Sequence, residues 1–294
     1  MAIGNSIQML PICVAILYIA LTPKTYEGMT PARIVVTPTL ATMATIYSLP
    51  RAGGPRSPRF AAYISRVAHH WGLSAYNPMA GSAAEDAVRA LIEIDAERLA
   101  AEEARDLAAR CDFEGVITIA IAVPSQGMWT DRLATELQHR TIGARTPAHG
   151  TALLWPGDAL NEAQVRTECA AEAVRIMWTT HHGVPDSLRG VLAREGLCYA
   201  LAPSSLHDTP ATHGDPGNPA VEEALNVLGD SSLQGDIAAV LYGDAAAIAM
   251  GWTPLGLGDK AGYHWATSRA RAIVDRVGAR TALRDSFPST QTSA

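Results

Sequence analysis

The stretch of sequence that decides the fold runs from Thr151 to Ala202. It reads TALLWPGD (151–158), then NEAQVRTECAAEAVRIMWTTHH (161–182), then GVPDSLRGVLAREGLCYALA (183–202). The first piece is a short apolar run that ends in a Pro-Gly turn, which predicts a strand over 151–155. The other two pieces predict helices over about 161–178 and 186–202, joined by a loop. We therefore expect a strand that is followed directly by two helices.

Two earlier stretches predict further strands. The run 115–123 (GVITIAIAV) is apolar throughout, which indicates a strand buried on both faces. The stretch 32–49 begins like a strand, and its later half fits a helix equally well. Other helices are expected over 59–71, 83–110, 129–139, 221–228, 233–250 and 260–277. Because no alternating strand–helix–strand series is visible, the pattern favours a mainly helical α+β fold over a doubly wound sheet.

The chain has 294 residues, 48% of them hydrophobic, which is enough for one large core. We expect a single α+β domain over 29–283 and a disordered polar tail over 284–294. Residues 1–28 form an apolar extension whose run 7–21 is shorter than the roughly 20 residues of a membrane span. A signal peptide requires positive charge before its apolar run, and here no Lys or Arg precedes the run. It is therefore expected to be a buried segment or a misassigned start before Met29, rather than an anchor.

Charge and cysteine usage exclude several functions. The net charge is -6 without a cluster of Lys or Arg, so we expect no nucleic-acid partner. Four cysteines without a C-x-x-C pair indicate reduced thiols in a cytoplasmic protein: Cys13, Cys111, Cys169 and Cys198. A glycine-rich phosphate loop is lacking, so no nucleotide cofactor is predicted. We expect no membrane association, and the sequence does not indicate an oligomeric state.

One face of the helix 161–178 carries unusual side chains. Val165, Glu168, Cys169, Glu172 and Ile176 share it at spacings of three to four residues. Two carboxylates one turn apart repel each other unless a cation or a proton intervenes. The face is either solvated, with arginines nearby, or turned inward. If it points inward, it predicts a metal site or acid–base chemistry.

The second helix resembles the glutamate helix of gluzincin-type zinc peptidases, in particular their predicted bacterial members. Three segments carry the similarity: E-G-L-C-Y (195–199), E-C-A-A-E-A-V-R (168–175) at the place of an H-E-x-x-H helix, and A-G-Y-H-W (261–265) near the start of a late helix. The resemblance implies a gluzincin-like scaffold with Glu168, Glu172 and Glu195 as metal ligands. Tyr263 or His264 would then polarise the substrate, and Cys169 would hold the place of the general base.

This chain departs from the family at the ligand positions. Glu168 and Glu172 replace both histidines, and Cys169 replaces the catalytic glutamate. Carboxylates suit harder cations such as Mg, Mn or iron better than zinc, whereas the family binds zinc, so the expected divalent ion is left open as Zn, Mn or Fe. Shifting the alignment by one residue would instead keep Glu168 as the base and lose both histidine ligands. Cys169 could also act as a thiolate ligand or nucleophile, or pair with one of two nearby histidines, His181 or His182.

The function expected from this resemblance is that of a metal-dependent enzyme, a hydrolase or related lyase. Its substrate would be a small molecule or a short peptide. The alternative is a non-catalytic binding protein on a decayed metallopeptidase scaffold. Three carboxylates packed together would repel by roughly 4 kcal/mol per pair at about 4 Å and an effective dielectric constant of about 20. If they converge, we therefore expect a bound metal ion or bound protons.

Overall fold

The computed structural model describes residues 32–52, 56–125, 129–142, 149–203 and 218–285. Most of these residues lie in helices, and three short strands form one sheet, so the prediction of a mainly helical fold is confirmed. The predictions for residues 1–28 and for nearly all of the 284–294 tail concern residues outside the described ranges. Among the described residues, no helix combines the length and the apolar content needed to cross a membrane.

The sheet consists of β1 (Arg33–Thr37), β2 (Val116–Ala122) and β3 (His149–Leu153), in that order and all parallel. The central strand β2 is buried from its second residue onward, as its unbroken apolar run predicts. Helices connect β1 to β2 and β2 to β3, so strands and helices do alternate here. The expectation of no such series was wrong, because parallel neighbours need long crossovers and these separate the strands widely in the sequence.

Apart from β2, the elements described between β1 and β3 are helices. After β1 the chain forms α1 (Leu40–Tyr47), α2 (Pro58–Val67), a 3-10 turn at Trp71–Leu73, α3 (Ser82–Glu93) and α4 (Ala96–Arg110), and α5 (Trp129–Ile142) follows β2. The single helix predicted over 83–110 is divided because Asp95 adopts a left-handed conformation, with φ of 55°. Next to this break, the carboxylate of Glu97 accepts hydrogen bonds from the backbone N–H groups of Thr39 and Leu40 and so caps the start of α1.

The chain after β3 contains only helices among its described residues. They are α6 (Glu162–His182), α7 (Leu188–Leu201), α8 (Pro219–Leu228), α9 (Gln234–Tyr242), α10 (Asp244–Ala249), α11 (Ala261–Val277) and α12 (Ala279–Arg284). Helix α6 continues one turn beyond its predicted end and stops at Gly183, whose φ is 80°. Gly243, with φ of 85°, likewise divides the predicted helix 233–250 into α9 and α10.

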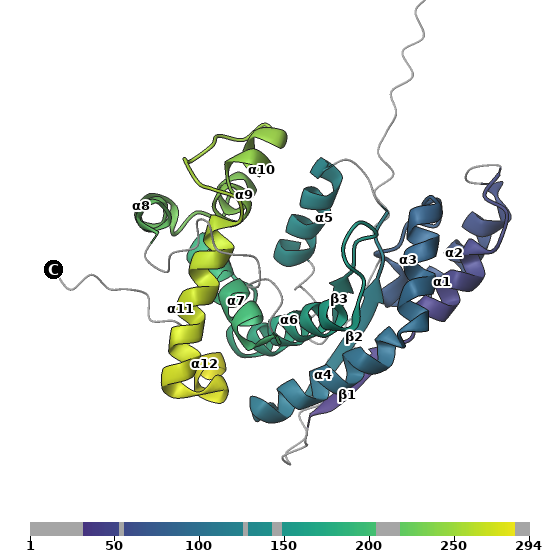
Figure 1. Cartoon of the computed structure of the whole chain (residues 1–294), viewed down its shortest axis with the longest axis horizontal. Helices are drawn as coiled ribbons and strands as arrows, with labels where there is room; N and C mark the ends of the chain where they lie inside the picture. Colours follow the sequence, from purple (N-terminus) through teal and green to yellow (C-terminus); the bar gives the residue numbers. More distant parts are fainter. Residues whose placement is uncertain (1–31, 53–55, 126–128, 143–148, 204–217, 286–294) are drawn as a thin grey trace, which may run out of the picture.

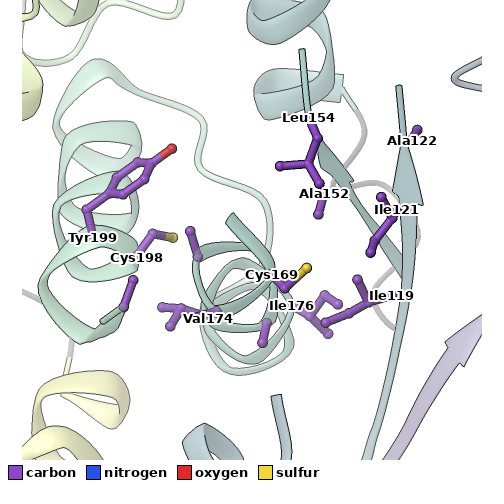
Figure 2. Close-up of a cluster of buried hydrophobic side chains, with 14 of the residues drawn as sticks. Ile119, Ile121, Ala122, Ala152, Leu154, Cys169, Val174, Ile176, Cys198 and Tyr199 are labelled. Atoms are coloured by element: carbon purple, nitrogen blue, oxygen red, sulfur yellow. The ribbon is translucent and has the colours of Figure 1, made fainter. Parts of the chain in front are cut away.

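Helix α6 lies at the centre of the core. It packs against β2, β3 and α4 on one side and against α7 on the other, and α7 in turn packs along α11 (Figure 1). Figure 2 shows Cys169 and Ile176 of α6 facing Ile119 of β2, with Cys198 coming from α7 on the opposite side of α6. Both cysteines are fully buried and unpaired, as is Cys111, so three of the four predicted free thiols are confirmed. Cys13 lies outside the described residues.

Candidate functional site

The glutamate-bearing face of α6 points into the protein. Val165, Cys169 and Ile176 are buried against the core, and only 5% of Glu172 and 8% of Arg175 is exposed to solvent. The interpretation of this face as solvated is therefore wrong for Glu172 and its neighbour Arg175. Charged groups at this depth need hydrogen-bonding partners, because burying even a neutral polar group without one costs roughly 2–7 kcal/mol, and an unpaired charge costs far more. The site is defined by the partners that these groups find.

Glu172 is held between β3 and its own helix. Its Oε1 accepts a hydrogen bond from the backbone N–H of Thr151 at 3.0 Å, and its Oε2 accepts one from Nη1 of Arg175 at 2.8 Å. The carboxylate reaches β3 only because residue 150 is a glycine, since a Cβ built there would overlap Glu172 Oε1. The glycine at position 150 therefore allows the Glu172 carboxylate to approach the backbone of β3 closely.

Glu195 is fully buried and faces two guanidinium groups. Arg175 donates from Nη2 to Oε2 at 2.8 Å and from Nε to Oε1 at 3.1 Å, and Arg194 donates from its Nε to Oε1 at 3.0 Å. Burial alone would lower the pKa of Arg175, but the neighbouring anionic groups, Glu195 foremost, raise it well above its usual value. Arg175 is thus a permanent cation between two buried carboxylates.

Glu168 joins the same group of side chains through a tyrosine. Its Oε2 accepts a hydrogen bond from the hydroxyl of Tyr199 at 3.3 Å, and its Oε1 accepts one from the amide of Gln164 at 3.3 Å. The Tyr199 hydroxyl also lies 3.5 Å from Nη2 of Arg175. The structure therefore brings together all three predicted metal ligands. We refer to Glu168, Glu172, Arg175, Arg194, Glu195 and Tyr199 as the glutamate–arginine cluster.

The cation at the centre of this cluster belongs to the protein. Arg175 contacts Glu172 and Glu195 directly and Glu168 through Tyr199. Within the described ranges, no group of three or more His, Cys, Asp or Glu side chains could hold a metal ion. Metal binding by the three glutamates stays a prediction. The guanidinium groups of Arg175 and Arg194 lower the repulsion among the glutamates, which was the reason to expect a metal ion or bound protons.

Cys169 lies on the sheet side of α6 rather than in the cluster. Burial raises the pKa of its thiol far above the usual value, and the charges of Glu168 and Glu172 raise it further. A thiol in this environment is protonated at neutral pH, whereas a nucleophile or metal ligand must be the thiolate. Pairing with His181 or His182 is wrong, because all three residues lie on one continuous helix. At about 1.5 Å per residue, the separation is on the order of 18 Å.

Tyr263 reaches the cluster through aromatic contacts. Its ring lies 5.8 Å from that of Tyr199, edge to face, and 5.4 Å from that of Tyr242 in the same manner. His264, the next residue of α11, is half-buried, and burial together with the charge of Lys260 lowers its pKa. Tyr263 is thus separated from Glu168 by the side chain of Tyr199. The roles of Tyr263 and His264 on a substrate stay predictions.

Two glycines in the segments that carry the family resemblance lie against the backbone of a neighbouring helix. A Cβ on Gly196, in the E-G-L segment, would lie 2.5 Å from the carbonyl oxygen of Ala266 in α11. A Cβ on Gly262, in the A-G-Y segment, would overlap the carbonyl oxygen of Val240 in α9. The two glycines let α7, α11 and α9 pack at short distance. Both therefore have a packing role.

Sequence reasoning missed several members of the site. Arg175 was assigned to the motif and to the solvated face, and Arg194 was not assigned at all. A signal was present for both: Arg175 follows Glu172 by three residues, and Arg194 directly precedes Glu195. Gly150 and Thr151 carry no such signal, because their roles depend on how β3 packs against α6.

Comparisons of the chain with models of known protein families, with curated proteins and with solved structures found no match.

Proposed function

We propose that this chain is a non-catalytic binding protein on a gluzincin-like scaffold, with the guanidinium of Arg175 in the place of a metal ion. One observation carries the proposal: Arg175 donates hydrogen bonds to both Glu172 and Glu195, two of the three predicted ligands. A divalent ion bound to the same carboxylates would lie beside this guanidinium. Two cations at such a distance repel strongly in a low-dielectric interior.

The arrangement of the helices supports the scaffold part of this proposal. The chain order is β3, α6, α7 and a late α11, which is the order that the family resemblance implies. Helix α6 carries Glu168 and Glu172, α7 carries Glu195, and α11 places Tyr263 against Tyr199. These contacts favour a shared arrangement of the site.

The ligand that we propose is a small molecule or a short peptide, and we propose no nucleic-acid partner. The proposed compartment is the cytoplasm, where unpaired cysteines such as Cys111, Cys169 and Cys198 remain reduced.

A second candidate is the metal-dependent hydrolase that the resemblance implies. One observation favours it: carboxylate oxygens of Glu172 and Glu195 both bind Arg175 at 2.8 Å, and Glu168 is linked to the same arginine through the hydroxyl of Tyr199. A divalent ion such as Zn, Mn or Fe would have to displace Arg175 from these oxygens. Tyr263 or His264 would then polarise the substrate.

Elemental analysis of the full chain, produced without a histidine tag, separates the two candidates. The binding-protein proposal expects no stoichiometric metal, and no heat of binding when Zn²⁺ or Mn²⁺ is titrated into the apo protein. One tightly bound ion per chain that is lost in Glu172→Gln would overturn it in favour of the hydrolase. Glu162→Gln is the matched control, because Glu162 is exposed in the first turn of the same helix.

A further inference from the structure

Helix α5 differs from the other long helices in how it is attached. Among the described elements it packs chiefly against the short helix α10. Figure 1 shows it above α6 and α7, between α9–α10 on one side and β3 on the other. Among its side chains that the structure describes, over 132–138, Leu133, Glu136 and Leu137 are buried, so its inward face there includes a carboxylate. Because this face carries Glu136, polar contacts contribute to the packing of α5 on the protein.

Two polar contacts made by the described side chains of α5 join it to the rest of the protein. Arg132 forms a two-pronged ion pair with Asp158, in the loop between β3 and α6, at 2.8 and 2.9 Å, and its guanidinium stacks on Trp155. Glu136 accepts hydrogen bonds from Arg132 at 2.9 Å and from the hydroxyl of Tyr242 at 3.2 Å. Arg132 and Asp158 are each about a third exposed, so water and salt reach this ion pair.

The contacts of α5 lead to the glutamate–arginine cluster. Tyr242 of α9 contacts Tyr263 of α11, which contacts Tyr199 of α7. The Tyr199 hydroxyl then donates to Glu168 and lies beside Arg175. Three tyrosine rings, each less than 10% exposed, thus lie between Glu136 of α5 and Glu168 of α6.

We propose that α5 is a lid over this tyrosine row and the glutamate–arginine cluster, closed by the Arg132–Asp158 ion pair and the Glu136–Tyr242 hydrogen bond. Opening breaks the contact between Glu136 and Tyr242 and exposes Tyr242, the end of the tyrosine row next to α5, to a ligand. This proposal rests on the proposed function only in treating the glutamate–arginine cluster as a ligand-binding site. Opening of the lid is measured without ligand or metal, so the lid proposal can fail while the binding-protein proposal stands, and the reverse.

Hydrogen exchange followed by mass spectrometry on the full chain tests the lid. Asp158→Ala removes the ion pair and should speed exchange of the α5 amides by about tenfold, because they exchange through local opening. Exchange in α6 and α7 should stay as in the wild type. The control is Glu222→Ala, which removes the exposed ion pair with Arg269 between α8 and α11 and should leave α5 unchanged. Unchanged exchange of α5 in Asp158→Ala would overturn the proposal.

Salt gives a second test that needs no variant. Raising the NaCl concentration to about 1 M shortens the Debye length to roughly 3 Å and weakens the partly exposed Arg132–Asp158 ion pair. Exchange of the α5 amides in the wild-type chain should then rise relative to those of α6. If α5 and α6 change by the same factor, in salt or in Asp158→Ala, α5 opens only when the whole protein unfolds and is not a lid.

Discussion

Arg175 and Glu195 form a two-pronged ion pair inside the protein, with Nη2 2.8 Å from Oε2 and Nε 3.1 Å from Oε1. The planar guanidinium matches the geometry of a carboxylate, and its remaining terminal nitrogen is directed to Glu172. One arginine thereby links α6 to α7 and, through Glu172, to β3. The ion pair is part of the packing of the core, so its removal should change stability and metal affinity together.

Arg175→Gln should be strongly destabilising. It leaves Glu172 and Glu195 buried without their shared cation, and breaking a buried pair in this way costs about 3–5 kcal/mol. Urea unfolding in EDTA measures the loss. The control is Arg269→Gln, whose exposed pair with Glu222 is worth about 0–1 kcal/mol.

The same variant should gain affinity for divalent cations. Without the guanidinium, Zn²⁺ or Mn²⁺ no longer meets a competing charge, so either ion should raise the melting temperature of Arg175→Gln more than that of the wild type. A variant as stable as Arg269→Gln, with no response to metal, would show that Arg175 does not compensate the two glutamates.

Glycine positions at the site should tolerate no side chain. Gly150→Ala pushes a methyl group into the carboxylate of Glu172, which is fixed by Thr151 and Arg175, and should cost about 1–3 kcal/mol. Gly196→Ala should cost at least as much, because its methyl group meets the backbone of α11 at Ala266. Gly81→Ala is the control, since its nearest neighbour is 3.9 Å away. Thermal unfolding of the three variants ranks their losses of stability. A loss in Gly81→Ala equal to those in the other two variants would contradict the prediction.

The sequence predicted those parts of the fold that depend on local pattern. The strand β2 follows from an apolar run without interruption, and α6 and α7 follow from helical runs between turn residues. The parallel sheet could not be predicted, because Arg33 pairs with Val116 across four intervening helices. Glu168 and Glu172 were found because they share one face of a helix, and Glu195 was found through the family resemblance. Their compensation by Arg175 was missed, because its bond to Glu195 depends on how α6 packs against α7.

Stability should fall in alkaline solution, and Cys111 should contribute to the fall. Burial raises the pKa of its thiol from 9.0 to about 11. The unfolded chain therefore loses this proton first, so the contribution is complete below about pH 9 and is lost as the pH rises to about 11. A shift of this size corresponds to roughly 2–3 kcal/mol.

Urea unfolding across this pH range, in the wild type and in Cys111→Ala, isolates the contribution. The variant loses some stability at every pH because it leaves a small cavity, so only the slope against pH is informative. The slope should be shallower in Cys111→Ala. Equal slopes would show that the thiol does not ionise differently in the two states.

Glu172→Gln in metal-free protein separates the two candidate functions by the sign of its effect. If the three glutamates form an empty metal site, the substitution relieves repulsion and raises the melting temperature. In the structure, however, Glu172 accepts from Arg175 and from the backbone of Thr151. The neutral amide loses the charge-assisted bond, worth about 1.5–3 kcal/mol, so we expect the melting temperature to fall in EDTA. Glu162→Gln, exposed at the start of α6, should change it by less than about 0.5 kcal/mol in equivalent stability. A rise in Glu172→Gln alone would favour the metal-dependent hydrolase, and equal behaviour of the two variants would contradict both candidates.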